Sequence, residues 1–226
     1  ASRTIRLAEY TPPAYLVDTV AIDVDIARPW ATVRATLAMR RNPEGAGGPL
    51  LLDGAHHELL SVALDGAALD EGRYAVAEGK LRVAEVPESF TLETVVRFDP
   101  WKNTRLEGFY ASKDGLFTQC EAEGFRCITW FPDRPDVMAT YRVTLHAAKD
   151  EFPHLLANGN LVESADEDGG RHRATWEDPF PKPSYLFALV GGRLVCERGR
   201  FVTRSGREVA LEIWVEPQNA DRCGHA

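Results

Sequence analysis

The chain has 226 residues, and its 26 Lys and Arg against 34 Asp and Glu give a formal charge of −8 with the histidines neutral. Phosphate backbones and anionic bilayers repel an acidic chain, which argues against nucleic-acid and membrane-surface binders. We therefore predict no nucleic-acid partner and no membrane partner. At 44% hydrophobic and 27% charged residues, the composition is that of a globular protein with an ample core.

The sequence also lacks signs of export. No run approaches the ~18 apolar residues that a membrane span requires, and the opening ASRTIRLAEY contains no apolar signal core. The four cysteines are too few and too irregularly spaced to staple a chain of this length, which favours reduced thiols. We therefore expect a cytoplasmic protein. The cysteines are Cys120, Cys127, Cys196 and Cys223.

Alternating apolar and polar residues predict a series of short strands. From Val20 to Ile26 the apolar residues alternate with Asp23 and Asp25, and the same period of two runs from Val33 to Met39. These two runs predict half-buried strands joined near Arg28-Pro29. Similar runs follow at 59–64, 80–86, 91–98, 139–146, 171–176, 185–190, 200–203 and 208–215.

Turn residues separate these runs at short intervals. Asn, Asp, Gly and Pro supply the backbone angles that tight turns need, as in Asn158-Gly159 and Ser205-Gly206. No convincing amphipathic helix of three turns, internal repeat or low-complexity tract interrupts the pattern. We therefore predict an all-β fold, a saddle-like multi-sheet β-sandwich with little helix, that is irregular between Phe109 and Asp136.

No complete active site is present in the sequence. The motifs H-E-x-x-H, C-x-x-C, G-x-S-x-G and G-x-x-x-x-G-K-[ST] are all absent. The histidines are better explained as structural or exposed residues, and the arginines between 193 and 207 as charges that protect an edge strand. We therefore predict no catalytic residue, no metal ligand and no cofactor in this chain.

The most informative segment is TQCEAEGFR at 118–126, which lies among aromatic residues. In an extended chain the period of two sorts its side chains onto two faces, Gln119, Glu121 and Glu123 on one and Cys120 and Ala122 on the other. A carboxylate and an amide oxygen flanked by aromatic rings can hold an ammonium group. On the residues alone, a strand with a solvent-facing polar side explains the pattern better.

Several long motifs occur in the order TQCEAEGFR (118–126), DRPDV (133–137), EDPFPKPSYLFALVGG (177–192) and TRSGREVALEIWVEP (203–217). In this order they resemble the amino-terminal domain of bacterial aminopeptidase N, the zinc-dependent alanyl aminopeptidases of the gluzincin class. The resemblance spans almost the whole chain, and LEGFY at 106–110 and LLANGN at 155–160 fit the same pattern.

The resemblance implies a β-saddle domain over 1–217 and, at 218–226, the start of a linker to a catalytic domain. It implies that Gln119 and Glu121 bind the free α-amino group of a peptide substrate, with Glu121 as the principal anion. It also implies that this domain shapes part of the pocket for the first residue of the peptide. The expected partners are therefore the N-terminus of the peptide substrate and the catalytic domain of the same chain.

The zinc ligands and the transition-state tyrosine of such enzymes lie downstream of this domain. The resemblance therefore implies a fragment of a metalloprotease, inactive alone and without a cofactor, whose full-length form is a zinc-containing hydrolase of peptide catabolism.

Two other functions remain open at this point. A non-catalytic β-sandwich could bind a peptide or protein partner, but it would have no chemical need for both Gln119 and Glu121. A carbohydrate-binding sandwich could use the five tryptophans as stacking platforms, although core packing explains Trp176 and Trp214 better because both lie inside alternating strands.

Overall fold

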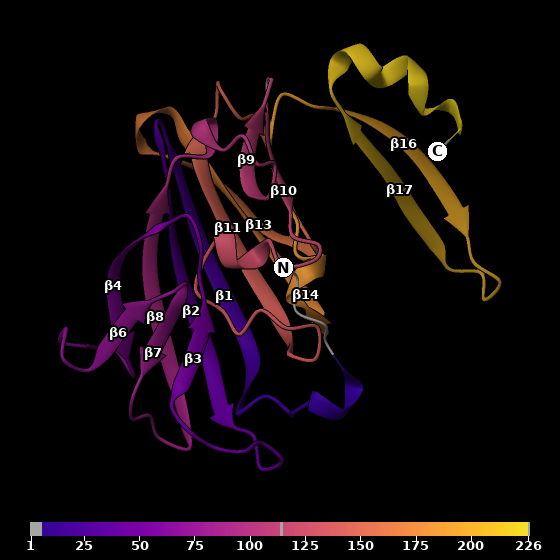
Figure 1. The fold of residues 1–226 in the computed structure, drawn as a ribbon. Helices are drawn as coiled ribbons and strands as arrows, with labels where there is room; N and C mark the ends of the chain where they lie inside the picture. The colour runs from indigo at the N-terminus through magenta and orange to yellow at the C-terminus, as the bar shows by residue number, and fades with distance from the viewer. Residues whose placement is uncertain (1–5, 114, 226) are drawn as a thin grey trace.

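Two long antiparallel strands, β1 (Tyr15–Ala27) and β2 (Trp30–Arg41), form the centre of the largest sheet. The computed structural model describes residues 6–113 and 115–225 (Figure 1). From Val20 onward β1 buries every second side chain, as the sequence predicts. A register shift between Val17 and Thr19 changes the parity, so that Val17 and Val20 both face the core.

The largest sheet has eight strands in the order β13-β14-β11-β1-β2-β8-β4-β5. All neighbours are antiparallel except β1 and β11, which run parallel and place residues far apart in the sequence side by side. The remaining strands of this sheet are β4 (Glu58–Leu64), β5 (Ala67–Ala68), β8 (Ser89–Phe98), β11 (Met138–Ala148), β13 (Asn160–Glu167) and β14 (Arg171–Pro183).

Three smaller sheets accompany it, in the orders β3-β7-β6, β12-β15-β10-β9 and β16-β17. Their strands are β3 (Leu50–Asp53), β6 (Tyr74–Ala77), β7 (Lys80–Val83), β9 (Gly108–Ser112), β10 (Gly115–Gln119), β12 (His154–Ala157), β15 (Leu189–Gly192), β16 (Val195–Val202) and β17 (Glu208–Val215). The 3-10 helices are η1 (Leu7–Glu9), η2 (Pro100–Lys102), η3 (Phe125–Cys127), η4 (Asp168–Gly170), η5 (Ser184–Leu186) and η6 (Pro217–His225). No helix within the described residues is long and apolar enough to span a membrane.

One buried core joins the eight-stranded, three-stranded and four-stranded sheets. Its residues come from the large sheet, such as Leu37 and Leu145, from β3 and β7, such as Leu52 and Leu81, and from β10, such as Leu116. Because the two smaller sheets pack their apolar faces against the large one, the body is a layered sandwich.

The hairpin of β16 and β17 stands apart from that body (Figure 1). Its strands pair with each other, and η6 contacts β16. Trp214 lies against His154 of β12, with 4.9 Å between the ring centroids. The segment expected to begin a linker, 218–226, is therefore part of η6 as far as residue 225, and the division of the chain at residue 217 stays a prediction.

The structure confirms the expected all-β, multi-sheet sandwich with little helix. Two local predictions are wrong. The run at 185–190 is not one strand, because η5 occupies Ser184–Leu186 and β15 begins only at Leu189. The region from Phe109 to Asp136 is not irregular throughout, because β9 and β10 form a hairpin that continues to Gln119 and η3 follows at Phe125–Cys127.

Candidate functional site

Gln119 and Glu121 lie where β10 ends and the chain turns. Gln119 is the last residue of the strand, and residues 121–124 form a turn that leads into η3. We call residues 120–126 the site turn. Because the chain leaves the extended conformation at Cys120, the predicted alternation is wrong beyond that point: Cys120 is buried, but Ala122 is exposed together with Glu121.

Glycine at position 124 makes this turn possible. The amide of Gly124 donates to the carbonyl oxygen of Cys120 at 2.8 Å. A Cβ atom at position 124 would lie 2.3 Å from the carbonyl oxygen of Gln119 and 3.0 Å from the Cα of Cys120. No side chain fits at those distances, so the return of the chain over β10 depends on this glycine.

The side chains of Gln119 and Glu121 leave their acceptor atoms free. Nε2 of Gln119 donates to the backbone carbonyl of Glu121 at 3.1 Å. In the part of the chain that the structure describes, neither Oε1 of Gln119 nor the carboxylate of Glu121 has a hydrogen-bond or ion-pair partner. An exposed amide oxygen and an exposed carboxylate two residues apart can both accept hydrogens from one ammonium group.

A buried polar cluster lies at the end of the site turn. Oδ2 of Asp133 accepts from the backbone N and from Nε of Arg126, each at 3.1 Å, and Oδ1 accepts from Oγ of Ser184 at 2.5 Å. The Asp133 side chain is 1% exposed. We call Arg126, Asp133 and Ser184 the Asp133 clamp; it joins η3, the loop after Phe131 and η5.

Aromatic packing supports the same turn from below. Phe125 is fully buried and meets Phe131 and Phe187 edge-on, with 5.0 Å between ring centroids in each pair. Burial raises the pKa of the Cys120 thiol well above its usual range and that of Cys127 to about 11. Both thiols are therefore protonated near neutral pH and are not suited to act as nucleophiles.

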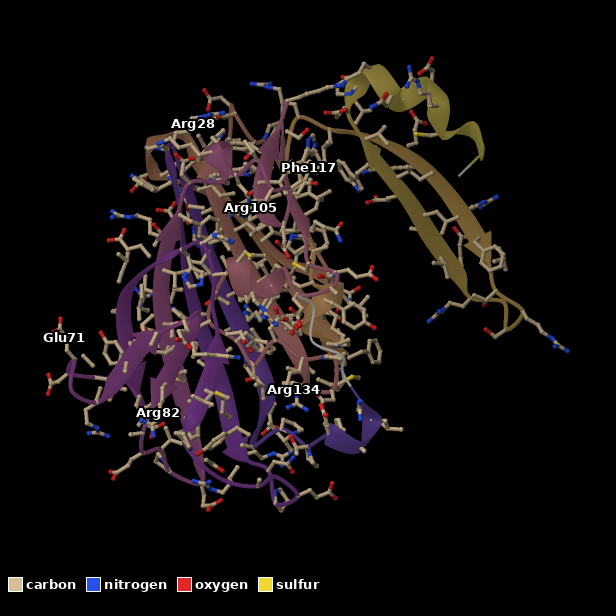
Figure 2. The ribbon with its side chains drawn as sticks, in the orientation of Figure 1. Arg28, Glu71, Arg82, Arg105, Phe117 and Arg134 are labelled. Atoms are coloured by element: carbon tan, nitrogen blue, oxygen red, sulfur yellow. The ribbon has the colours of Figure 1, made fainter. Side chains whose placement is uncertain are left out.

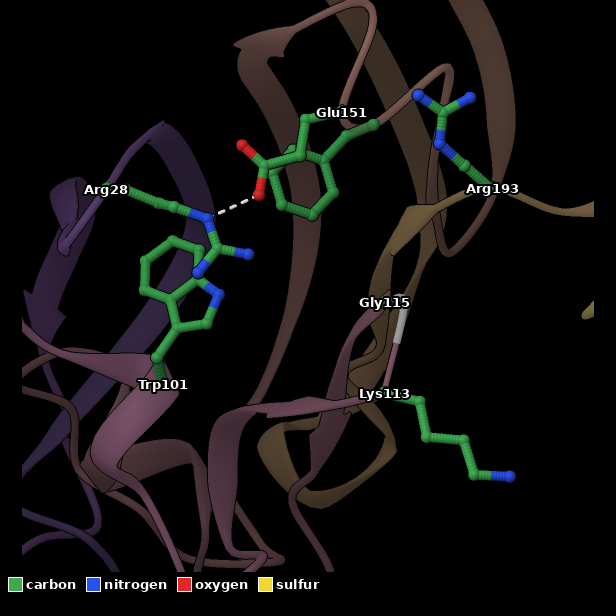
Figure 3. Close-up of a pocket in the computed structure, with 7 residues that line it drawn as sticks. Arg28, Trp101, Lys113, Gly115, Glu151 and Arg193 are labelled. Atoms are coloured by element: carbon green, nitrogen blue, oxygen red, sulfur yellow. Dashed lines mark hydrogen bonds and ion pairs between the residues drawn. The ribbon is translucent and has the colours of Figure 1, made fainter.

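Five surface cavities of the described residues are lined by residues other than Gln119 and Glu121. A small one of about 130 Å³ is bordered by Arg28, Lys113 and Arg193 (Figure 3). Arg28 is ion-paired with Glu151 and lies 4.3 Å above the ring of Trp101, and Lys113 points away from Glu151 in Figure 3. The basic side chains do not converge on one point, so we assign no anion site there.

Gly115, at the start of β10, also lines this cavity, and Gln119 lies at the other end of the same strand. In Figure 2, Arg28 lies at one end of the body and Arg134, the neighbour of Asp133 in the chain, lies toward the other end. Within residues 6–113 and 115–225, none of Arg28, Lys113 and Arg193 forms an ion pair with Glu121.

Zinc does not fit the described residues. No group of three His, Cys, Asp or Glu side chains among residues 6–113 and 115–225 could hold a metal ion together. His146 lies between two carboxylates, but both of its ring nitrogens are engaged in hydrogen bonds: Nδ1 with Glu167 at 2.9 Å and Nε2 with Asp23 at 3.1 Å. We therefore assign no zinc ligand and no zinc-dependent step to this chain.

The sequence predicts a role for Gln119 and Glu121 but none for Arg126, Asp133 or Ser184. All three lie inside the motifs that carry the family resemblance. The contact between Asp133 and Ser184 joins residues 51 positions apart, and no periodicity predicts such a pairing. The one available signal is Asp133 itself, an acid that directly follows the apolar residues Trp130, Phe131 and Pro132 in the sequence.

Comparison with known proteins agrees with this architecture. Aminopeptidase N of Caulobacter vibrioides is 48% identical over 224 residues, which is 99% of this chain and 26% of that protein. A crystal structure of Legionella pneumophila aminopeptidase A in complex with aspartic acid matches with a TM-score of 0.92 and 34% identity, over 97% of this chain and 26% of that one. This chain thus spans about a quarter of the length of these relatives.

A more distant structure shares the fold. An M1 zinc metallopeptidase from Deinococcus radiodurans, an E323A mutant bound to a Tyr-Ser-Ala substrate, matches with a TM-score of 0.72 at 17% identity, over 89% of this chain and 48% of that one. Residues 21–186, which run from within β1 to the end of η5 and include Gln119 and Glu121, match the family described as the peptidase M1 N-terminal domain. The chain belongs to that family.

Proposed function

We propose that this chain is the amino-terminal part of a zinc-dependent aminopeptidase and that Glu121, assisted by Gln119, holds the free α-amino group of the peptide substrate. One observation carries the proposal: the Oε1 atom of Gln119, at the end of β10, and the carboxylate of Glu121, on the turn that follows, are exposed acceptors with no partner among the described residues. The 48% identity with an aminopeptidase N supports the same activity for the full-length protein. We further propose a cytoplasmic role in peptide catabolism.

Charge complementarity explains how this site would select substrates. An N-terminal ammonium group donates up to three hydrogen bonds, and a carboxylate and an amide oxygen are both acceptors. By fixing the amine, Glu121 would set the distance from the peptide terminus to the bond that is cut, which defines an exopeptidase. An acetylated terminus has no charge and would leave the carboxylate without its partner.

Zinc belongs to the proposal for the full-length protein only. The Deinococcus relative is named as a zinc metallopeptidase. When bound, zinc activates water and polarises the scissile carbonyl. We propose that the 226-residue chain alone hydrolyses no peptide, because its own residues bind and orient the substrate without activating water. Stoichiometric zinc or hydrolysis of an alanyl chromogenic substrate by this chain would contradict that.

The decisive test is Glu121→Ala in the full-length enzyme. Removing one partner of a desolvated charge pair costs about 2–5 kcal/mol, so kcat/KM for an alanyl substrate should fall about 30-fold to several thousand-fold while zinc content stays intact. Glu71→Ala is the matched control, because Glu71 is an exposed carboxylate on a distant turn (Figure 2). If Glu121→Ala and Glu71→Ala gave the same kinetics, Glu121 would not belong to the site.

A further inference from the structure

The position of Glu121 is not fixed by its own packing. Glu121 and Ala122 are both exposed, so the site turn must be held by the residues on either side of this pair. On one side Cys120 is buried beneath the turn. On the other side Arg126 ends the turn and enters the Asp133 clamp.

Asp133 satisfies three donors with two oxygen atoms. Besides the two bonds from Arg126 and the one from Ser184, its backbone carbonyl accepts from Nη2 of Arg126 at 3.1 Å. The guanidinium and the backbone amide of Arg126 are therefore both oriented by one buried residue. A planar guanidinium held at two points cannot rotate without breaking one of the bonds.

The clamp also ties the site turn to the three-stranded sheet. The carbonyl oxygen of Arg126 accepts from the backbone N of Ala55 at 2.9 Å and from Nε2 of His57 at 3.1 Å. Nη1 of Arg126 lies 3.7 Å from Oδ1 of Asp53, at the end of β3. Asp133 thus lies where the site turn, η5 and the residues after β3 meet.

Such a cluster is costly if stability is its only purpose. A buried carboxylate loses hydration, and well-packed apolar residues often stabilise a fold as much as a buried ion pair does. Geometric control is a stronger reason, because a displacement of about 1 Å of a substrate-binding group can lower the rate about 100-fold.

We infer that Asp133 is a positioning residue for substrate amine binding, acting through Arg126 on the site turn that carries Glu121. The inference rests on the proposed function of Glu121. Asp133 itself touches no substrate. Its loss should therefore change how well the enzyme uses a free peptide amine and should have little effect once the Glu121 carboxylate is gone.

A double-mutant cycle in the full-length enzyme tests this. Asp133→Ala alone should lower kcat/KM for an alanyl substrate by about 10- to 100-fold, through a higher KM as well as a lower kcat. Combined with Glu121→Ala, it should lower kcat/KM by no more than about threefold beyond Glu121→Ala alone, because residues that act through one another are not additive. Fully additive losses would overturn the inference.

The controls separate positioning from folding. Asp136→Asn removes a carboxylate from the same loop. The Asp136 carboxylate binds Arg134 and Tyr10 and makes no contact with the site turn, so kcat/KM of this variant should stay within about threefold of wild type. Asp133→Asn keeps an acceptor for Arg126 and should restore most of the activity lost in Asp133→Ala. A loss in Asp136→Asn as large as the loss in Asp133→Ala, or no recovery from Asp133→Ala to Asp133→Asn, would overturn the inference.

Two further outcomes are distinguishable. If Asp133→Ala fails to fold, Ser184→Ala removes a single donor and should show a smaller loss with the same dependence on Glu121, whereas an additive loss counts against the inference. If Glu121→Ala leaves kcat/KM unchanged, the proposed function fails. If Glu121→Ala lowers kcat/KM strongly and the loss from Asp133→Ala adds to it in full, the inference about Asp133 fails while the proposed function of Glu121 stands.

Discussion

The eight-stranded sheet and the site turn are stabilised in different ways. In the sheet, a side chain's direction follows from its place in the strand, and β8 buries every second residue from Phe90 to Phe98. In the site turn, a different interaction fixes each residue: Gly124 leaves room for the returning backbone, Phe125 is buried in the core, and Arg126 binds Asp133. The sheet repeats one interaction many times, whereas the turn uses several different ones once each.

This difference predicts where substitutions act. A sheet built from repeated cross-strand contacts can lose one of them and keep the others. The alternation along each strand still directs the remaining side chains to the same face of the sheet. The site turn has no such redundancy. Substitutions there should therefore affect stability and the position of Glu121 out of proportion to the small area involved.

The largest expected effect comes from Gly124→Ala. The new Cβ would meet the carbonyl oxygen of Gln119 at 2.3 Å, and backbone cannot rotate away as a flexible side chain can. Overpacking of this kind should lower the free energy of unfolding by about 3 kcal/mol, measured by urea titration of this chain.

Gly72→Ala is the control for that experiment, because a Cβ atom added at Gly72 would meet no atom within 4 Å and the residue has no positive φ. Its free energy of unfolding should stay within about 0.5 kcal/mol of wild type. Equal urea midpoints for the two variants would mean that the site turn adapts freely, and the contrast with the sheet would fail.

The contrast also explains what the sequence could predict of the fold. The strands β1 and β2 and their connection at Arg28-Pro29 follow from alternation alone, and the structure confirms them. β9 and β10 were not predicted, because GFYAS and GLFTQ are five residues long and show no clear polar alternation. Their strand conformation is set by pairing with each other and with β15.

The site shows the same limit. Gln119 and Glu121 were found because the motif around them resembles a family, and their spacing alone favoured a plain polar strand. The alternation of side chains that the spacing predicts is wrong beyond Cys120, because the chain turns there and is no longer extended. No sequence pattern pairs Asp133 with Ser184, because they lie 51 positions apart and only the folded chain places η5 against the loop after Phe131.

A second prediction concerns His57, which supports the site turn. Burial lowers the pKa of His57 to about 4, because the charged ring loses hydration beside Trp130. The unfolded chain takes up this proton near pH 6.5, so the stability contributed by neutral His57 is complete above pH 6.5 and is lost as the pH falls toward 4. At pH 5 the loss should be about 2 kcal/mol.

The test of His57 compares pH dependence rather than absolute stability. Urea unfolding of wild type and His57→Gln at pH 7.5 and at pH 5 should show a smaller decrease on acidification in the variant. A matched control is His56→Gln, because His56 is exposed and precedes it directly. If His57→Gln and wild type lost stability in parallel, the ring would not be held neutral by the fold.

The smallest effect should come from His146, on the outer face of the large sheet, and with the opposite sign. Partial burial lowers the pKa of His146, but hydrogen bonds and attraction from Glu167 and Asp23 outweigh burial and raise it above its ordinary value. The folded chain therefore keeps this proton to higher pH than the unfolded chain. Its stabilising contribution is complete below pH 6.5 and is lost as the pH rises through the raised value.

Proton NMR titration of the imidazole measures that value directly. Asp23→Asn should lower the pKa of His146, whereas Asp25→Asn should change it much less, because Asp25 lies on the same face of β1 but pairs with Arg171. The effect on stability should be small, since exposed ion pairs contribute only about 0–1 kcal/mol. Equal shifts of the His146 pKa in the two variants would mean that His146 responds to the total charge of this sheet face and not to its contact with Asp23. The surface of the large sheet, like its core, would then be stabilised by many similar interactions and not by specific pairs.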